Sequence, residues 1–214
     1  MGPCLLHRSQ GNPGDTPAGL RYFCLMTAPT KAALREAALA RRDALDPAFR
    51  IEAALTLAET FPLDVIPVSG KVVSGFLPIQ SEIDVRPLMD RLRRAGARLA
   101  LPAFPNRKGP MIFRELVRGA ELVPMGFGTY GPGPEAAEVE PEILLTPLAA
   151  FDATGNRIGY GKGHYDQALA RLDALARRTA VGIAFACQEV DAVPHEPHDR
   201  RLDFVLTDTG FRTF

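Results

Sequence analysis

The sequence is poor in cysteine, with three in 214 residues and no two of them in a CxxC pair. The odd number and wide spacing of Cys4, Cys24 and Cys187 argue against a disulfide framework and a cysteine-based zinc site. His195 and His198 are three residues apart, but each follows a proline, which is unfavourable for placing both on one helix face. We therefore expect no histidine or cysteine metal centre.

Neither charge nor long apolar runs are in excess. The 25 basic and 25 acidic residues cancel, whereas binding to nucleic acid through phosphate contacts favours a basic surplus. No apolar run reaches the roughly 18 residues needed to span a bilayer, and the first 26 residues lack the apolar core of a secretory signal. We expect a cytoplasmic, monomeric protein with neither nucleic acid nor a membrane as a partner.

The N-terminal segment differs in composition from the rest of the chain. Residues 1–26 are rich in glycine and proline and show no periodicity, whereas a clear helical pattern begins after Thr30. We predict a disordered extension over residues 1–29 and a single domain over residues 30–214, a length that suits one hydrophobic core. A start at Met26 would explain the contrast, and a genuine extension without order would explain it equally well.

Helical and strand patterns alternate along the remaining residues, which predicts an α/β protein: a three-layer α/β/α, Rossmann-like fold with a mostly parallel central sheet. Thr30 suits an N-cap, Asp46 and Pro47 suit the start of a second helix, and Asp84 is the expected cap of a third. Helices are expected at residues 31–45, 46–60, 84–95 and 163–176, strands at residues 71–77, 98–101, 111–116, 143–146, 179–185 and 203–207, and a surface loop at residues 124–142.

The stretch 154–166, TGNRIGYGKGHYD, follows an expected strand and is the most unusual part of the sequence. Gly155, Gly159, Gly161 and Gly163 fall within nine residues, and a helix pattern follows them. Glycine lets backbone amides turn inward and approach a ligand closely, and amides beside a helix N-terminus form an anion site. Because ligands in α/β sheets bind beyond the carboxyl ends of strands, we predict a phosphate-binding loop here.

Charged side chains in the same stretch support this prediction. Arg157 offers a planar fork of donors to phosphate oxygens, and Lys162 offers a point charge. Asp166 could hold a magnesium ion that bridges phosphate oxygens. The stretch is not a Walker loop, because Gly163 follows Lys162 in place of Ser or Thr, and it lacks the third glycine of a dinucleotide fingerprint. From the residues alone, a flexible loop before a helix is the alternative.

A longer segment, residues 146–169, resembles the signature of the 5-formyltetrahydrofolate cyclo-ligase family, also called 5,10-methenyltetrahydrofolate synthetases. Members carry a proline, an aromatic-Asp pair and then G-x-R-[LI]-G-x-G-x-G-x-Y-D, and the match runs without a gap. Other matching segments follow in the family's order. They are Lys31 to Arg35, Phe76 to Pro78 with Glu82, Leu101 with Pro102, Met111 to Phe113, Asp199 and Asp203.

The resemblance implies an ATP-dependent carbon–nitrogen ligase. Members of the family convert 5-formyltetrahydrofolate and ATP, with Mg²⁺, into 5,10-methenyltetrahydrofolate, ADP and phosphate. Phosphorylation makes the formyl oxygen a good leaving group, and the neighbouring folate nitrogen then closes the ring. Such a transfer needs mainly positioning and charge neutralisation. We therefore expect 5-formyltetrahydrofolate and ATP as substrates and Mg²⁺ as the cofactor.

The resemblance also implies roles for individual residues. Arg35, Arg157 and Lys162 would be catalytic, and Leu77 and Glu82 would contact the folate, with Glu82 accepting hydrogen bonds from the pterin edge. The implied ATP contacts are Lys31, Arg35, Arg157, Gly159, Tyr160, Gly161, Lys162, Gly163, His164 and Tyr165, and the implied magnesium ligands are Asp166 and Asp199.

Two positions depart from the family pattern. His164 stands where members usually have Tyr or Phe. Thr129 replaces an Ile in a loop that matches only partly, and Tyr130 is our candidate there for an aromatic contact with the folate. Each assignment has a plainer alternative, since Lys31 and Arg35 could form a solvated helix face and Tyr130 could be an exposed loop residue. For the whole chain, the second hypothesis is a folate- or nucleotide-binding protein that has lost turnover.

Overall fold

The structure is a computed structural model, and it describes residues 29–106, 109–126, 128–196 and 199–214. The helices are α1 (Lys31–Asp43), α2 (Pro47–Thr60), α3 (Arg86–Arg94), α4 (His164–Asp173) and the short 3₁₀ helix η1 (Ala186–Gln188). The strands are β1 (Val72–Ser74), β2 (Arg98–Ala103), β3 (Ile112–Glu115), β4 (Leu122–Gly126), β5 (Thr129–Pro132), β6 (Ile143–Pro147), β7 (Ala150–Phe151), β8 (Arg157–Ile158), β9 (Thr179–Ile183), β10 (Phe204–Thr207) and β11 (Gly210–Thr213). The hypothesised start at Met26 lies outside the described residues.

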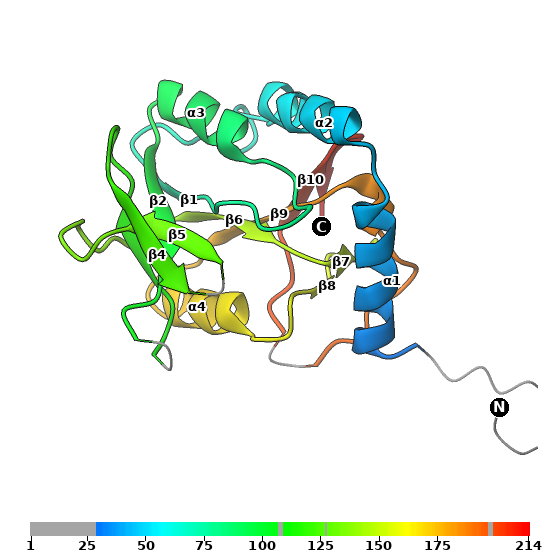
Figure 1. The fold of residues 1–214 in the computed structure, drawn as a ribbon. Helices are drawn as coiled ribbons and strands as arrows, with labels where there is room; N and C mark the ends of the chain where they lie inside the picture. Colours follow the sequence, from blue (N-terminus) through cyan, green and yellow to red (C-terminus); the bar gives the residue numbers. More distant parts are fainter. Residues whose placement is uncertain (1–28, 107–108, 127, 197–198) are drawn as a thin grey trace, which may run out of the picture.

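A seven-stranded sheet in the order β11-β10-β9-β6-β1-β2-β3 forms the centre of the molecule (Figure 1). The inner neighbours β10, β9, β6, β1 and β2 pair in parallel. The two outer strands, β11 and β3, pair with their neighbours in the antiparallel direction. The prediction of a mostly parallel central sheet is confirmed.

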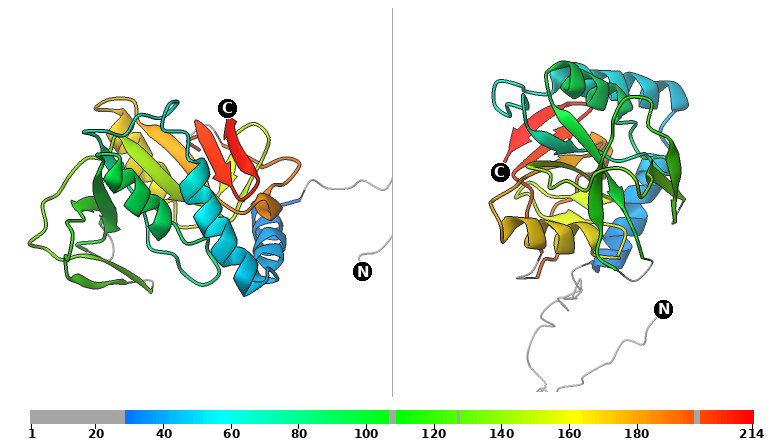
Figure 2. Two further views of the ribbon diagram at one scale, coloured as in Figure 1. Left: turned by 90° about the horizontal axis from the view of Figure 1, so that it is seen from above. Right: turned by 90° about the vertical axis from the view of Figure 1, so that its left-hand side faces the viewer.

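Helices cover both faces of this sheet. Neighbouring strand residues point to opposite sides, so the apolar strands place side chains on both faces that must be buried. On one face, Val73 and Leu145 pack in the same cluster as Leu57 of α2 and Leu88 of α3. On the other face, Leu144 belongs to a second cluster that contains residues of α4. Figure 2 shows α4 on the opposite side of the sheet from α2 and α3, so the three-layer prediction is also confirmed.

Helix α1 stands apart from these layers, beside the small β7-β8 sheet (Figure 1). Thr30 caps it as predicted, because the Thr30 hydroxyl accepts a hydrogen bond of 3.2 Å from the Ala33 amide. Ala38 of α1 packs in a third buried cluster with Ala150 and Ile158. This position brings the charged residues of α1 to the glycine-rich stretch that follows β7.

The helix starts show how well local capping signals predict boundaries. Asp46 caps α2 as expected, accepting a hydrogen bond of 2.8 Å from the Ala48 amide. Helix α3 begins two residues later than predicted, with Val85 as its N-cap. Asp84 still contributes, because its carboxylate accepts a hydrogen bond of 3.0 Å from the Arg86 amide.

The predicted surface loop at residues 124–142 is partly wrong, because the chain forms the antiparallel β4-β5 hairpin there. Gly126 and Gly128 adopt φ values of 87° and 77° at its turn, a backbone conformation that glycine adopts at little cost. Strand β5 also contacts β2 of the central sheet, so the hairpin lies against the sheet. No helix among the described residues is long and apolar enough to cross a membrane.

Candidate active site

The candidate site lies where the direction of the chain through the sheet changes. From β1 the chain continues to β2 on one side, whereas from β6 it continues to β9 on the other. Such a switch point leaves a crevice beyond the carboxyl ends of the two strands, where ligands bind. A cavity of about 300 Å³ lies there. It is lined by Phe76, Leu77, Ile79, Glu82, Pro102, Phe104, Met111, Thr129, Tyr130, Pro147, Arg157, Gly159, Tyr160, Lys162, Gly163, His164, Tyr165 and Asp166.

Most of the residues that the sequence singled out meet in this cavity. Its lining includes the expected folate contacts Leu77, Glu82 and Tyr130. It also includes much of the glycine-rich stretch, from Arg157 to the start of α4. Tyr130 is 53% exposed and lies on β5, so it is a strand residue at the cavity and not part of an isolated surface loop.

The glycine-rich stretch is held in a defined conformation. Asp152 is buried at its base and accepts hydrogen bonds from the amides of Thr154, at 2.9 Å, and Asn156, at 3.0 Å. Burial acts to raise the pKa of Asp152, but hydrogen bonds from the Val193 amide, the Asn156 side chain, and the hydroxyl and amide of Thr154 outweigh it and leave the pKa lowered. The start of the loop is therefore held by a carboxylate that accepts hydrogen bonds at both of its oxygens.

Glycine is required within the stretch for two reasons. Gly161 and Gly163 have φ values of 87° and 67°, in the left-handed region, and Gly163 is the N-cap of α4. At Gly155, with φ 85°, an added Cβ would lie 2.8 Å from a ring carbon of Phe214. The backbone of the stretch can therefore approach both its own core and a ligand.

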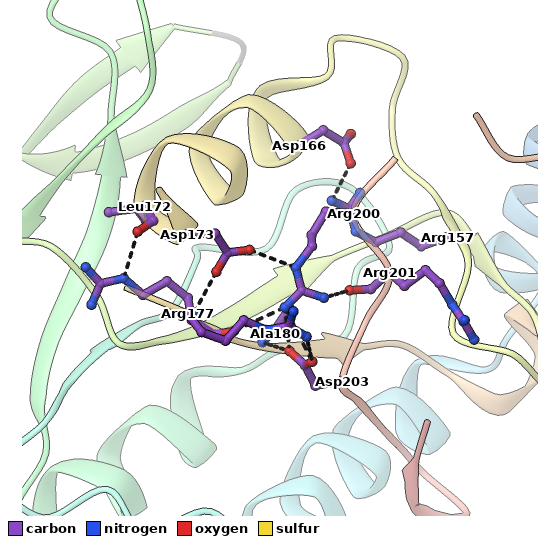
Figure 3. A network of polar contacts seen from close by, with 10 residues as sticks. Arg157, Asp166, Leu172, Asp173, Arg177, Ala180, Arg200, Arg201 and Asp203 are labelled. Carbon is purple, nitrogen blue, oxygen red and sulfur yellow. Dashed lines mark hydrogen bonds and ion pairs between the residues drawn. The ribbon is translucent and has the colours of Figure 1, made fainter. Parts of the chain in front are cut away.

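Arg157 and Asp166 form an ion pair at the wall of the cavity (Figure 3), with Arg157 Nη2 and Asp166 Oδ1 2.7 Å apart. Arg157 is only 8% exposed. Within the described part of the chain, its Nε and the buried hydroxyl of Tyr165 have no hydrogen-bond partner. Buried polar atoms without partners are costly, and an oxygen-rich ligand in the cavity would satisfy them.

Below this ion pair, a second polar network holds α4 to the sheet (Figure 3). Arg200 bridges Asp173 at the end of α4, at 2.9 Å, and Asp203 before β10, at 3.0 Å. Asp203 also accepts a hydrogen bond of 2.8 Å from the Ala180 amide at the start of β9. Asp203 therefore has a structural role here, and it lies outside the cavity lining.

Helix α1 places two further cationic side chains, Arg35 and Lys31, next to the segments around the cavity. Arg35 Nε donates a hydrogen bond of 2.7 Å to the carbonyl oxygen of Gly159, and the Arg35 guanidinium lies close to Gly161. Lys31 Nζ pairs with Asp199 Oδ2 at 2.5 Å. Neither side chain lines the cavity itself, but both contact segments more than 100 residues away. They do not form a merely solvated helix face.

The wall of the cavity that includes Leu77 and Glu82 carries one carboxylate among apolar side chains. Glu82 Oε2 accepts a hydrogen bond of 2.9 Å from the Ile79 amide, and the Tyr160 hydroxyl also bonds to this carboxylate. Burial raises the pKa of Glu82, and these two hydrogen bonds and the charge of Arg42 oppose that rise only in part. A partly desolvated carboxylate of this kind suits a ligand that presents several N–H donors.

Two features of the site were not predicted from the sequence. Phe104 lies against His164, with ring centroids 4.9 Å apart and an interplanar angle of 59°, and burial and Lys162 lower the pKa of this histidine. Arg42 is buried and reaches Tyr160. Its spacing of seven residues from Arg35 places both on one face of α1, which is the signal that could have identified it.

The predicted magnesium ligands pair with cations in the structure, Asp166 with Arg157 and Asp199 with Lys31. Among the described residues, no three His, Cys, Asp or Glu side chains gather into a metal site. Magnesium is commonly held by one or two carboxylates together with phosphate oxygens and water, without an all-protein cage. The residues therefore fit a magnesium ion that arrives with a nucleotide.

Comparison with known proteins identifies relatives over most of the chain. Residues 27–208 match the profile of the 5-formyltetrahydrofolate cyclo-ligase family. The 5-formyltetrahydrofolate cyclo-ligase of Escherichia coli K12 is 35% identical over 175 residues, covering 78% of this chain and 94% of the relative. That of Mycolicibacterium smegmatis is 32% identical over 190 residues, covering 85% and 95%.

Solved structures agree with this relationship. The Aquifex aeolicus 5,10-methenyltetrahydrofolate synthetase has a TM-score of 0.68 and 26% identity, covering 86% of this chain and 92% of that one. The fold is also that of the Mycoplasma pneumoniae 5,10-methenyltetrahydrofolate synthetase, with a TM-score of 0.65, 24% identity and coverage of 83% and 98%. The resemblance read from the glycine-rich signature is confirmed, and this chain belongs to the 5-formyltetrahydrofolate cyclo-ligase family.

Proposed function

We propose that this protein converts 5-formyltetrahydrofolate to 5,10-methenyltetrahydrofolate in a reaction that consumes ATP and needs Mg²⁺. The observation that carries the proposal is the single cavity at the switch point, which has the glycine-rich stretch on one wall and Glu82 on another. The two walls differ in chemistry as the two substrates do. One has cations and backbone amides that suit phosphates, and the other has a carboxylate among apolar residues.

In the proposed first step, the formyl oxygen attacks the terminal phosphorus of ATP. A new P–O bond forms, the bond from that phosphorus to the bridging oxygen breaks, and ADP leaves. Charge accumulates on the phosphoryl oxygens and on the leaving ADP, so nearby fixed cations accelerate the step. Arg157 and Lys162 line the cavity, and Arg35 reaches its edge through Gly159.

In the second step, the neighbouring folate nitrogen attacks the formyl carbon and loses its proton as the ring closes. The carbon–oxygen bond breaks, and phosphate leaves with the former formyl oxygen. This step depends on holding the folate in one orientation. We assign that task to Glu82, through the N–H groups of the pterin edge, and to Leu77 and Tyr130, through apolar contact.

Bound magnesium would neutralise phosphate charge during the transfer, and we propose Asp166 and Asp199 as its protein ligands. In the structure, Arg157 and Lys31 form ion pairs with these two carboxylates.

The proposal is tested by mixing the purified protein with 5-formyltetrahydrofolate and Mg-ATP and following the absorbance of the methenyl product. We expect product only in the complete mixture, with none when ATP is omitted or when EDTA removes the magnesium. Binding of both substrates without product would reject the proposal and favour a binding protein that has lost turnover. Product formed without ATP would reject the phosphorylation step.

A further inference from the structure

Arg42 is the most buried charged side chain near the cavity, with 1% of its surface exposed. Its Nη1 donates a hydrogen bond of 2.6 Å to the Tyr160 hydroxyl, and its Nε donates one of 2.9 Å to the Ser81 hydroxyl. The guanidinium carbon also lies 5.9 Å from the centre of the Tyr160 ring. A buried cation is costly, so a side chain held in this way calls for an explanation beyond helix packing.

The donor character of Arg42 determines how Tyr160 can act. A guanidinium has no acceptor atoms, so in the bond between Arg42 and Tyr160 the hydroxyl oxygen must accept. The single hydroxyl proton of Tyr160 is then available for another acceptor, and we assign that role to the Glu82 carboxylate, which lines the same cavity as Tyr160. The bond to Arg42 thereby directs the tyrosine proton toward Glu82.

The second bond of Arg42 acts on the backbone that carries Glu82. Gln80, two residues before Glu82, has a φ of 52°. This value lies in the left-handed region, which residues other than glycine rarely adopt. Such a conformation persists only where its surroundings hold it. Arg42 fixes Ser81, the residue between them, through its hydroxyl, and Ile79 bonds to the amide and the carboxylate of Glu82.

We propose that Arg42 is a positioning residue that aims the Glu82 carboxylate at the folate through Tyr160 and Ser81. This inference rests on the proposed function, because it assumes that Glu82 receives the folate. It also links the two walls of the cavity, since Tyr160 belongs to the glycine-rich stretch and Ser81 to the segment after β1. Arg42 itself is absent from the cavity lining, so it acts through these neighbours.

The test compares Arg42→Met, Tyr160→Phe and the adjacent control Arg41→Met, with KM for each substrate and kcat measured separately. Arg41 is a suitable control because it is exposed and donates to the backbone carbonyls of Cys187 and Glu189 instead of to Tyr160 or Ser81. For Arg42→Met and Tyr160→Phe we expect the KM for 5-formyltetrahydrofolate to rise about 10- to 100-fold. An effect of this size corresponds to the loss of one hydrogen bond to a charged group. The control should keep the wild-type KM.

A double-mutant cycle separates positioning from general stability. If Arg42 acts through Glu82, Arg42→Met should raise the folate KM in the wild-type background but change it less than about twofold in Glu82→Gln. Arg42→Lys should restore only part of the effect, because a lysine ammonium cannot reproduce the planar fork that reaches both partners. Equal effects of Arg42→Met in both backgrounds would overturn the inference, as would an unchanged folate KM.

Two outcomes keep this inference distinct from the proposed function. If the wild-type protein forms no product, the proposed function fails, whatever the variants do. If the wild-type protein is active but the cycle is additive, only the role of Arg42 fails. Should Arg42→Met not fold, as judged by its thermal melt, the cycle of Arg42→Lys with Glu82→Gln gives the same decision, because Arg42→Lys keeps a cation at this buried position but loses the planar fork.

Discussion

Lys31 and Asp199 are 168 positions apart in the sequence, yet Lys31 Nζ and Asp199 Oδ2 lie 2.5 Å apart in the structure. The pair joins the first turn of α1 to the segment before β10. Two oppositely charged side chains meet beside the glycine-rich stretch, one proposed to bind ATP and the other magnesium.

Lys31→Ala should raise the KM for ATP about tenfold, because one charged contact to phosphate is worth roughly 1.5 kcal/mol. It should lower the free energy of unfolding by less than about 1 kcal/mol, since the pair with Asp199 is partly exposed. Steady-state kinetics and urea unfolding check the two effects. Arg94→Ala, which breaks the exposed pair with Asp90, is the control and should leave the ATP KM unchanged.

Arg157→Ala should lower kcat by about 10²- to 10³-fold, because a fixed cation is lost from a water-poor site where phosphoryl charge develops. The folate KM should change much less, since Glu82 lies on another wall of the cavity. Single-turnover kinetics would measure the chemical step directly. Arg171→Ala on α4, whose partner Glu140 is also exposed, serves as control, and a wild-type rate for Arg157→Ala would remove Arg157 from the mechanism.

Asp166→Asn should shift the magnesium activation curve to higher concentrations by about tenfold, because an amide is a weaker ligand than a carboxylate for this hard cation. The measurement is the initial rate against free Mg²⁺ at saturating ATP and folate. The exposed change Asp90→Asn should leave the curve in place. A curve for Asp166→Asn that coincides with the wild-type curve would contradict the metal assignment.

Glu82 should make the stability of the wild-type protein depend on pH. Its pKa is raised above 4.5 in the folded state, mainly by burial, so the folded protein binds its proton more tightly than the unfolded chain does. Its contribution to stability therefore falls as the pH rises from about 4.5 through the folded-state pKa. Urea unfolding across this range should show Glu82→Gln gaining stability relative to wild type with rising pH. The exposed change Glu121→Gln should follow the wild-type curve.

Gly155→Ala should destabilise the protein more than Gly119→Ala. Both glycines have positive φ, 85° and 79°, so each substitution costs roughly 1–2 kcal/mol of backbone strain. At Gly155 the new Cβ also meets the Phe214 ring at 2.8 Å and the Leu202 carbonyl oxygen at 3.1 Å, whereas at Gly119 it meets open space. The difference in Tm between the two variants measures the steric part of the cost at Gly155. Equal losses of Tm would show that the Phe214 ring moves aside for the added Cβ.

Local signals in the sequence predicted the beginnings of elements best. Thr30 and Asp46 cap their helices because the hydrogen bonds involved join residues two or three positions apart. The β4-β5 hairpin and β11 were missed because they are stabilised by pairing with other strands and show little periodicity of their own. The predicted start of α3 was wrong by two residues because Asp84, the expected cap, lies one position before the actual N-cap, Val85. Asp84 accepts a hydrogen bond from the Arg86 amide from that position.

The sequence by itself determined the family, the alternation of helices and strands, and the glycine-rich stretch at residues 154–166 that we propose binds phosphate. These properties reside in short runs of residues, where spacing alone places glycines and charges together. Only the tertiary structure decided which distant groups meet: Lys31 with Asp199, Arg35 with Gly159, and Arg42 with Tyr160. Those contacts depend on packing α1 against the β7-β8 sheet through small buried residues such as Ala38. No local pattern specifies that arrangement, because it joins segments that lie more than 100 residues apart in the sequence.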